Sequence, residues 1–315
     1  MTSMRQKDGG ADPGRLSRRS FLCTTTVAAA AAAAAGWRAE TADAAAPDPL
    51  IGATGPRGLV DTNVWLGQWP GRRLPLEETP ALVARLRRQG VRQAWAGSFD
   101  GLWHKDLGAV NARLAAECRR QGRGLLTPFG TINPADPAWE EDLRRCAEEH
   151  QMPGIRLHPN YHGYQLDDPA LARLLDRAGQ RGLIVQLVAA MEDERTQHPR
   201  MRVPQVDVAP LAALLASRPE LRLVLLNWGR GANSVQPPRL AEAGQICFDI
   251  ATLEGVGGVA SLLRQVSAGR VVFGSCAPLF YLESALLKLQ ESPLTEAQLA
   301  AVRADNALRL RRRVS

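Results

Sequence analysis

The regular alternation of two kinds of segment limits the fold of this chain more than any other feature. Between residues 59 and 277, eight short runs of apolar and β-branched residues alternate with amphipathic stretches of 10–16 residues. Short apolar runs separated by helix-length segments are typical of parallel strands joined by helical crossovers. Eight such units are the number that closes a parallel sheet into a barrel. The sequence therefore predicts an α/β fold, a (β/α)8 TIM barrel.

Local patterns predict the individual elements. Asp168 and Pro169 offer an N-cap and a first-turn proline for one helix. Gly90, Gly122 and Gly182 follow predicted helices, where a left-handed residue is expected. Residues 295–312 predict an extra C-terminal helix. The predicted strands are residues 59–66, 92–99, 124–133, 154–159, 183–190, 221–228, 246–253 and 270–277.

An open, doubly wound sheet is the alternative architecture. The first predicted strand is not followed by G-x-G-x-x-G, which disfavours the dinucleotide-binding version of that fold. A length of 315 residues also allows two domains, but no internal repeat or low-complexity linker divides the chain after residue 46. We therefore predict that residues 47–315 form one barrel domain.

Residues 1–46 have the pattern of an export signal. Arg18 and Arg19 precede Phe21 and Leu22, an apolar run follows, and residues 42–44 form a small-x-small cleavage site. The apolar run is about 14 residues, shorter than the roughly 20 needed to span a bilayer. Paired arginines followed by Phe-Leu are typical of the twin-arginine route; a Sec signal or an alanine-rich tail is the alternative. We expect a periplasmic or extracellular protein that uses the twin-arginine translocation machinery and has no stable membrane anchor.

The formal net charge of +7 does not indicate a nucleic-acid partner. Removing residues 1–44, with six basic and four acidic residues, lowers it to +5, and the remaining charges of both signs mix along the predicted helices. The five cysteines show neither a CxxC motif nor zinc-knuckle spacing, so no structural zinc or disulfide framework is predicted. The expected partner is a small molecule, with a homo-oligomer left open.

Polar and aromatic residues gather where the predicted strands end. In a TIM barrel this edge carries the chemistry, and four of the five histidines and four of the seven tryptophans fall there. Aromatic walls with a few convergent polar groups are typical of a small-molecule pocket. Packing at the barrel rim is the alternative explanation for the tryptophans.

Five motifs resemble the amidohydrolase-related family, which includes aminocarboxymuconate-semialdehyde decarboxylase-like enzymes. They are Leu59-Val-Asp-Thr-Asn-Val-Trp-Leu-Gly, Gly154-Ile-Arg-Leu-His-Pro, Asp167-Asp-Pro, Phe273-Gly-Ser-Cys-Ala-Pro and Asp305-Asn-Ala-Leu-Arg-Leu. The resemblance covers residues 59–310 and implies a metal-dependent hydrolase or nonoxidative decarboxylase. It also implies a divalent metal held by histidines on strands one, five and six and by an aspartate on strand eight.

This chain departs from the family pattern at every metal-ligand position. Those positions hold Asn63, Trp65, Val188, Asn227 and Cys276. Tryptophan and valine cannot ligate a metal, and asparagine binds zinc poorly. We therefore predict that the usual metal centre is absent. A divalent metal at a displaced site, through His158 and His162 or through Asp193 and His198, is left open.

Two functions remain from this reasoning. The first is an exported hydrolase or nonoxidative lyase that acts on a small organic or carbohydrate-derived molecule without the usual metal, and the alternative is a noncatalytic ligand-binding pseudoenzyme on the same barrel. His158, His162, Asp193 and Cys276 are the predicted catalytic residues, as acid–base groups or as a thiol nucleophile. The predicted ligand-binding residues are Trp65, Trp69, Trp103, His104, Arg156, Asn160, Arg195, His198, Asn227 and Asp249. Arg156 and Arg195 are expected to anchor an anion, with an internal ion pair of Arg156 as the alternative.

Overall fold

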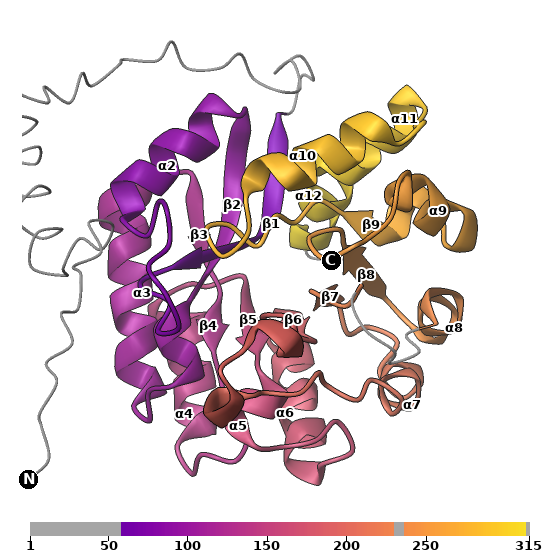
Figure 1. Ribbon diagram of the computed structural model, residues 1–315. Coiled ribbons are helices and arrows are strands. Elements are labelled where there is room, and N and C mark those ends of the chain that lie inside the picture. Colours follow the sequence, from indigo (N-terminus) through magenta and orange to yellow (C-terminus); the bar gives the residue numbers. More distant parts are fainter. Residues whose placement is uncertain (1–57, 230–235, 313–315) are drawn as a thin grey trace, which may run out of the picture. The chain divides into compact units, whose positions relative to one another are not determined.

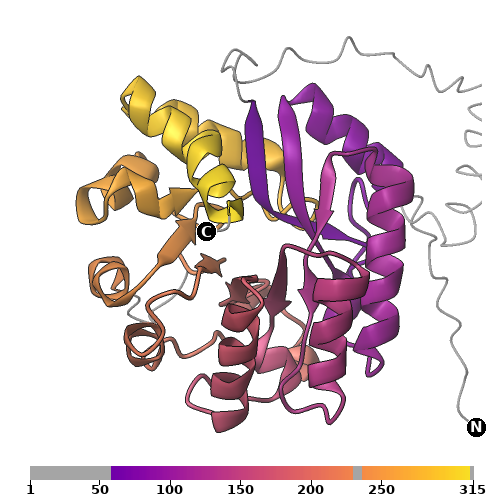
Figure 2. The same cartoon turned by 180° about the vertical axis from the view of Figure 1, so that it is seen from behind.

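The computed structural model describes residues 58–229 and 236–312, in which a ring of parallel strands is surrounded by helices (Figures 1 and 2). The predicted signal, residues 1–46, lies outside the described residues. All strand pairings between neighbours are parallel. The strands are β1 (Leu59–Leu66), β2 (Val91–Ser98), β3 (Leu126–Pro128), β4 (Gly130–Thr131), β5 (Gly154–Leu157), β6 (Ile184–Val188), β7 (Leu223–Leu226), β8 (Ile246–Asp249) and β9 (Val271–Val272).

Helices cover the outer side of the ring and short helical turns follow several strands (Figure 1). The α-helices are α2 (Thr79–Arg88), α3 (Leu107–Gly122), α4 (Trp139–Arg144), α5 (Pro159–His162), α6 (Pro169–Gln180), α7 (Leu211–Ala216), α8 (Pro237–Ala243), α9 (Gly258–Gln265), α10 (Leu282–Glu291), α11 (Glu296–Ala300) and α12 (Asn306–Arg311). The 3-10 and π segments are η1 (Phe99–Leu102), η2 (Arg145–Glu149), η3 (Glu194–Thr196), η4 (Pro199–Met201), η5 (Ala268–Arg270) and η6 (Ala301–Asp305).

The ring closes between its first and last strands. The backbone N–H of Thr62 donates to the carbonyl of Phe273 at 2.9 Å, and that of Trp65 donates to the carbonyl of Ala277 at 2.8 Å. The third barrel position is shared by β3 and β4, because the backbone N–H of Phe129 turns to the carbonyl of Ala96 at 2.8 Å. The predicted (β/α)8 barrel is therefore confirmed, with its third strand divided in two.

The helix termini confirm most of the local predictions. Gly90 and Gly182 have left-handed φ angles of 78° and 63°. Gly122 was wrongly predicted as left-handed: it is the last residue of α3, and Arg123 takes the left-handed conformation with φ 46°. A side chain at position 122 would place its Cβ 2.8 Å from Leu126 Cβ, so this glycine serves a close approach of helix and strand.

The amphipathic helix predicted after Asp168 is also present. The Asp168 carboxylate accepts from the backbone N–H of Ala170, and Pro169 occupies the first turn of α6. Leu171, Leu174, Leu175 and Ala178 are buried against the barrel. Helical spacing and capping therefore suffice to position α6.

The C-terminal helical stretch joins the barrel wall. α11, the π segment η6 and α12 together form the extra helix predicted over residues 295–312. In η6 the carbonyl of Val302 accepts from the backbone N–H of Phe273 at 3.0 Å. The Asn306 side-chain amide donates to the carbonyl of Val271 at 2.7 Å. The last helix therefore holds the last strand in place.

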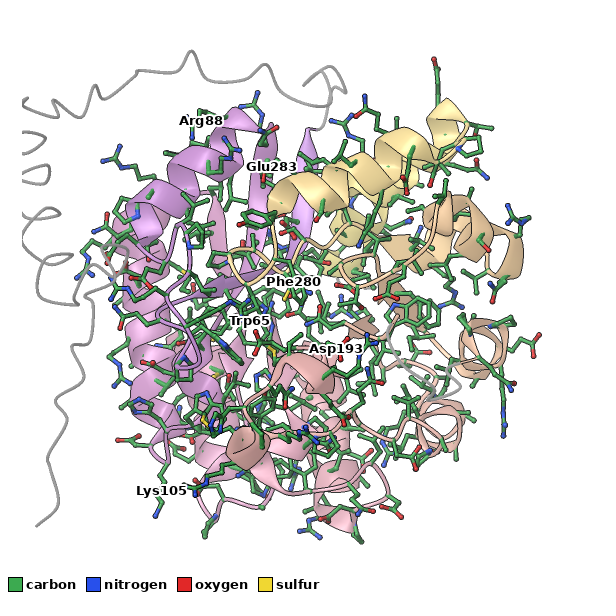
Figure 3. The ribbon with its side chains drawn as sticks, in the orientation of Figure 1. Trp65, Arg88, Lys105, Asp193, Phe280 and Glu283 are labelled. Atoms are coloured by element: carbon green, nitrogen blue, oxygen red, sulfur yellow. The ribbon has the colours of Figure 1, made fainter. Side chains whose placement is uncertain are left out.

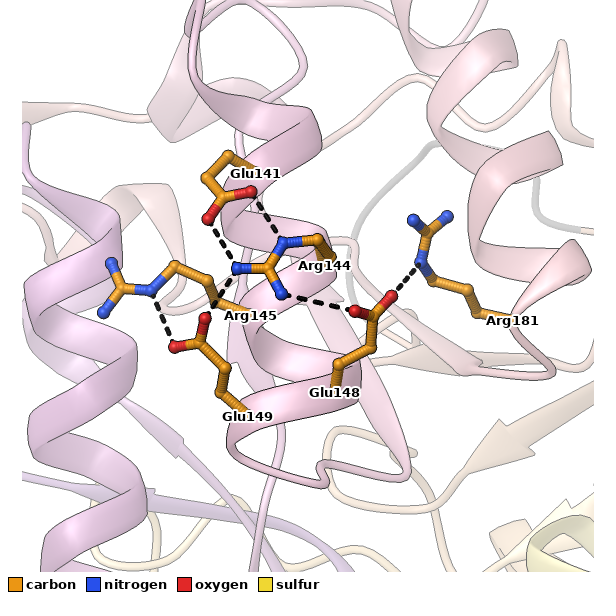
Figure 4. Close-up of polar contacts among 6 residues, drawn as sticks. All are labelled: Glu141, Arg144, Arg145, Glu148, Glu149 and Arg181. Carbon is orange, nitrogen blue, oxygen red and sulfur yellow. Dashed lines mark hydrogen bonds and ion pairs between the residues drawn. The ribbon is translucent and has the colours of Figure 1, made fainter.

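Charges on the outer surface are paired locally. Arg144, at the end of α4, bonds Glu141, Glu148 and Glu149, and the network extends to Arg145 and Arg181 (Figure 4). Exposed ion pairs of this kind add little stability individually. Among the described residues, no helix is both long enough and apolar enough to cross a membrane.

Candidate functional site at the barrel mouth

The carboxyl ends of the strands enclose a cluster of buried polar side chains. Asn63 and Trp65 lie near the end of β1, Asn227 directly follows β7, Asp249 ends β8, and Cys276 lies in the loop after β9. None of the five side chains is exposed to solvent. Residues distant in the sequence therefore meet at the edge of the barrel where active sites are found.

Asn63 is the centre of this cluster. Its amide nitrogen donates to Asn227 Oδ1 at 2.8 Å and to Asp249 Oδ2 at 2.8 Å. Its oxygen accepts from the indole N–H of Trp65 at 2.9 Å. Asp249 Oδ1 accepts from the backbone N–H of Asn227 at 3.0 Å. Hydrogen bonds thus join the ends of three strands, and every polar atom of the Asn63 side chain has a partner.

A second buried carboxyl lies beside this network. Asp61 Oδ1 accepts from the backbone N–H groups of Asn63 and Ser275, both at 3.0 Å, and Asp61 Oδ2 accepts from Ser275 Oγ at 2.5 Å. Burial raises the pKa of Asp61 to about 7, although the Ser275 bonds act in the opposite direction. Burial likewise raises the pKa of Asp249 to about 6, against the opposing bonds from Asn63 and Asn227.

Arg156 crosses the barrel interior from β5. Its guanidinium donates to Gln186 Oε1 at 2.8 Å, to the Val64 carbonyl at 3.0 Å and to the Trp95 carbonyl at 3.1 Å. The guanidinium carbon also lies 4.5 Å from the centre of a Trp65 ring. The alternative to an anion anchor, an internal ion pair of Arg156 with Asp249 or Glu254, is not among these hydrogen bonds. Its observed donors are directed at protein groups, which fits a structural role better than a ligand anchor.

His158 and His162 carry three buried nitrogens that have no hydrogen-bond partner among the described residues. His158 is 1% exposed, and neither of its ring nitrogens has a hydrogen-bond partner among the described residues. Its ring centre is 5.5 Å from Trp65 and 5.7 Å from His162. A buried polar group without a partner costs roughly 1–3 kcal/mol. Burial lowers the pKa of both histidines, so both are neutral near pH 7.

Aromatic rings form one wall of this region. Trp65 stacks on Phe99 with ring centres 5.2 Å apart and an interplanar angle of 8°, and Trp69 meets the edge of Phe99 at 5.3 Å. Further out, Trp103, with 45% exposure, contacts Tyr161 edge-on at 5.1 Å. Figure 3 shows Trp65 within the ring of strands. These rings come from β1 and from the loops after β1, β2 and β5, and their contact with a ligand stays a prediction.

The loop after β6, which holds the predicted site residues Asp193, Arg195 and His198, contains its own ion pair. Asp193 accepts from Arg195, whose Nη2 lies 2.5 Å from Asp193 Oδ2, and the Arg195 side chain is exposed. His198 is exposed and accepts from the backbone N–H of Arg200 at 3.2 Å. Asn160 donates to the carbonyl of Pro204 at 2.5 Å, which connects the α5 turn to the end of this loop.

Cys276 is a poor nucleophile in this setting. Its thiol is fully buried, and Asn227 Nδ2 lies 3.5 Å from the sulfur. Burial raises the pKa of Cys276 to about 12, so the reactive thiolate is scarce near neutral pH. Asn227 and Cys276 have left-handed φ angles of 56° and 58°. Such conformations in non-glycine residues are typical of functional sites.

The structure separates the predicted site residues into two groups. Trp65, Arg156, His158, Asn227, Asp249 and Cys276 are buried together inside the mouth. His104, Arg195 and His198 instead lie at the exposed rim. His104 is 3.9 Å from the carboxylate of Asp100.

Sequence reasoning missed several residues of the mouth. Gln186 bonds Arg156 and also donates to the Thr62 carbonyl at 2.6 Å. A polar residue inside the apolar run of β6 was the available signal. Arg72, which forms an ion pair with Glu192, had no such signal because it lies in a polar loop.

A family model for amidohydrolases matches residues 59–313. The chain belongs to the amidohydrolase family. A comparison with curated protein sequences finds no significant match. Family membership agrees with the resemblance that the sequence motifs carry.

Solved structures with the same fold include several decarboxylases. 2,6-Dihydroxybenzoate decarboxylase from Rhizobium has a TM-score of 0.59 and 15% identity, covering 80% of this chain and 98% of that chain. 5-Carboxyvanillate decarboxylase from Novosphingobium aromaticivorans, in complex with manganese and a nitrobenzoic acid, has a TM-score of 0.65 and 12% identity, covering 84% and 98%. An amidohydrolase-like protein from Staphylococcus aureus has a TM-score of 0.60 and 13% identity, covering 80% and 98%. At these identities the likeness is one of fold.

The 5-carboxyvanillate decarboxylase structure contains manganese. The side chains at the mouth of this chain are a different set of possible metal ligands. Among the described residues, no three His, Cys, Asp or Glu side chains gather as a group that would hold a metal ion. The positions at which the resemblance implies metal ligands hold two amides, an indole, a valine and a buried thiol. This set does not match the ligands expected for manganese or zinc.

Proposed function

We propose that this amidohydrolase-family barrel is an exported, metal-independent protein that binds a small organic molecule at its mouth. In this proposal the protein binds a ligand at the barrel mouth but does not catalyse hydrolysis or decarboxylation with a metal ion. The buried aromatic rings support a ligand site. So do three imidazole nitrogens that have no partner among the described residues, both of His158 and Nδ1 of His162.

The single observation that carries the metal-independent function is the position of the Asn63 amide. Its nitrogen lies 2.8 Å from both Asn227 Oδ1 and Asp249 Oδ2. A metal ion needs lone pairs directed at it, but here N–H groups already occupy the space between the two oxygens. Trp65, at the neighbouring ligand position of the family, donates to Asn63 and has no lone pair to offer.

Metal analysis of the purified protein tests this proposal. The chain is produced with added Mn²⁺ and Zn²⁺, dialysed, and measured by mass spectrometry and by calorimetric titration. We expect less than stoichiometric metal and no saturable binding. His104→Ala is the matched control because it removes an exposed histidine outside the cluster. One ion per chain that survives dialysis, and is lost on Asp249→Asn but not in the control, would overturn the proposal.

Export through the twin-arginine route is supported by Arg18, Arg19 and the following Phe21 and Leu22. Cell fractionation of the full chain tests it. We expect the wild-type protein outside the cytoplasm and the double substitution Arg18→Lys, Arg19→Lys inside. Equal export of the two chains would refute this route.

A hydrolase or nonoxidative lyase without metal is the second candidate. It is favoured by one observation: neither nitrogen of buried His158 has a partner among the described residues, so either could exchange a proton with a bound molecule. The substrates named for the related structures, 2,6-dihydroxybenzoate and 5-carboxyvanillate, are the first to assay. Turnover that is lost in His158→Gln but retained in Cys276→Ser would establish this candidate. Absence of turnover would support the binding role.

A further inference from the structure

We propose that three loops form a cover over the barrel mouth, and that Arg72 keeps this cover closed by joining them. The cover consists of residues 67–78 after β1, 189–206 after β6 and 278–281 after β9. Its consequence for a ligand, which enters only when the Arg72 contacts open, rests on the proposed binding function.

The interior of the mouth is closed to solvent. Trp65 and Cys276 have no exposed surface, and His158 is 1% exposed. A molecule can contact these side chains only after part of the protein has moved. The segments that lie over them therefore control access to the interior.

The inner side of the cover is apolar. Trp65 and Cys276 of the mouth belong to one hydrophobic cluster of buried residues. Each loop of the cover contributes a buried side chain to the same cluster, namely Trp69, Met191 and Leu279. Withdrawing these side chains exposes apolar surface to water, so the closed arrangement is the favoured one when no ligand is bound.

Arg72 joins the three loops through polar contacts. It lies in the loop after β1, forms an ion pair with Glu192 of the loop after β6, and donates to the carbonyl of Leu279 at 3.4 Å. The Arg72 side chain is 49% exposed, and that of Glu192 is 12% exposed. An ion pair that reaches solvent in this way is weak enough to open and close while the barrel stays folded.

The loop after β6 can move as one piece. The backbone N–H of Val206 donates to the carbonyl of Ala189 at 2.9 Å, so the two ends of the loop meet. Within the loop, the backbone N–H of Val203 donates to Gln197 Oε1 at 2.7 Å. A loop with joined ends and internal bonds keeps its own shape when a contact at its edge is released.

A cavity of about 630 Å³ lies next to Arg72. Arg72 and Leu279 line it, together with residues of α10 and of the segment after β8. Leu279 therefore borders both this cavity and the buried cluster of the mouth. Release of the Arg72 contacts frees Leu279 and Met191 on the inner side of the cover, so the cavity becomes the entrance to the interior.

Chemical labelling of Cys276 measures opening without any ligand. The purified full chain is treated with N-ethylmaleimide, a small uncharged thiol reagent, and mass spectrometry of the peptides gives the rate at each cysteine. Cys118 and Cys146 are buried in a different hydrophobic cluster, so they report unfolding of the barrel. We expect Cys276 to be labelled about fivefold faster in Arg72→Ala than in the wild type, with unchanged rates at Cys118 and Cys146.

Arg73→Ala is the matched control. Arg73 is the next residue of the same loop, but it pairs with Glu77 inside that loop. This variant should keep the wild-type rate at Cys276. Exchange of the two charges is the reverse test: Arg72→Glu should speed the labelling of Cys276, and adding Glu192→Arg should slow it again, because opposite charges then face each other once more.

An unchanged rate at Cys276 in Arg72→Ala would overturn the proposal, as would an equal acceleration in Arg73→Ala. If Cys118 and Cys146 accelerate together with Cys276 in Arg72→Ala, the milder variant Glu192→Gln decides. Joint acceleration of the three cysteines in that variant too would overturn the proposal, because access would then require unfolding of the barrel.

The outcome is independent of the proposed function. Metal content and ligand binding are measured on separate samples of the same proteins. Stoichiometric metal would refute the metal-independent function and leave the role of Arg72 unaffected, whereas unchanged labelling of Cys276 would refute the role of Arg72 alone.

Discussion

The contribution of Asp61 to the stability of the barrel should fall as the pH rises from 5 to 8, because Asp61 is buried where its charged form is poorly solvated. Burial raises its pKa from 3.8 to about 7. The folded chain therefore holds a proton that the unfolded chain releases above pH 4. The resulting stability is complete below the unfolded pKa and is lost as the pH rises through the folded pKa.

The size of the effect follows from the two pKa values. Linkage between pKa 3.8 and pKa 7 gives a loss of about 2.5 kcal/mol in the free energy of unfolding between pH 5 and pH 8. Asp249, with a pKa of about 6, adds a loss of about 1.5 kcal/mol over the same range. Asp61→Asn removes the first contribution. It leaves that of Asp249 and also the opposite contribution of His158 and His162, whose lowered pKa values make stability rise with pH.

Urea unfolding followed by circular dichroism at pH 5, 6, 7 and 8 measures how the free energy of unfolding changes with pH. We expect the free energy of unfolding of the wild type, taken relative to that of Asp61→Asn, to fall by about 2.5 kcal/mol between pH 5 and pH 8. Asp167→Asn, which changes an exposed carboxylate, is the control and should keep the wild-type slope. Equal slopes for Asp61→Asn and the wild type would refute the assignment of this pH dependence to Asp61.

Three further predictions concern packing, reactivity and capping. Gly274→Ala should destabilise the fold by about 1–3 kcal/mol in urea unfolding, because the new Cβ would lie 2.7 Å from Asp249 Oδ2; wild-type stability would contradict this. Cys276 should resist iodoacetamide in the folded protein at pH 8, because its thiol is fully buried. Rapid labelling of Cys276, detected by mass spectrometry, would refute the conclusion that this thiol is unreactive. Asp168→Ala should cost about 1 kcal/mol of unfolding free energy by removing the bond to Ala170, whereas Asp167→Ala should cost little.

The elements that the sequence predicted correctly depend on short-range rules. The α6 helix follows from an N-cap at Asp168 and apolar residues at helical spacing, and both signals lie within one segment. The division of the third strand at Phe129 depends on a bond to Ala96 of another strand. No local pattern could show that bond, so residues 124–133 were predicted as a single strand.

The same distinction applies to the candidate site. The order of residues at the strand ends was sufficient to place Trp65, Asn227 and Asp249 at one edge of the barrel. It could not show that the amide of Asn63 bridges two oxygens, because that requires three strands in register. Nor could it separate buried His158 from exposed His198, since both follow strands and differ only in how the loops pack.

The contact of the first strand with the last has a consequence for how the protein is made. β1 meets the segment after β9 through the pairs Thr62–Phe273 and Trp65–Ala277, which are separated by more than 200 residues of chain. The ring cannot close, and the mouth cannot form, until the ribosome has released almost the whole polypeptide. The site therefore assembles in one late step, and a chain truncated before the last strand would contain its residues without their geometry.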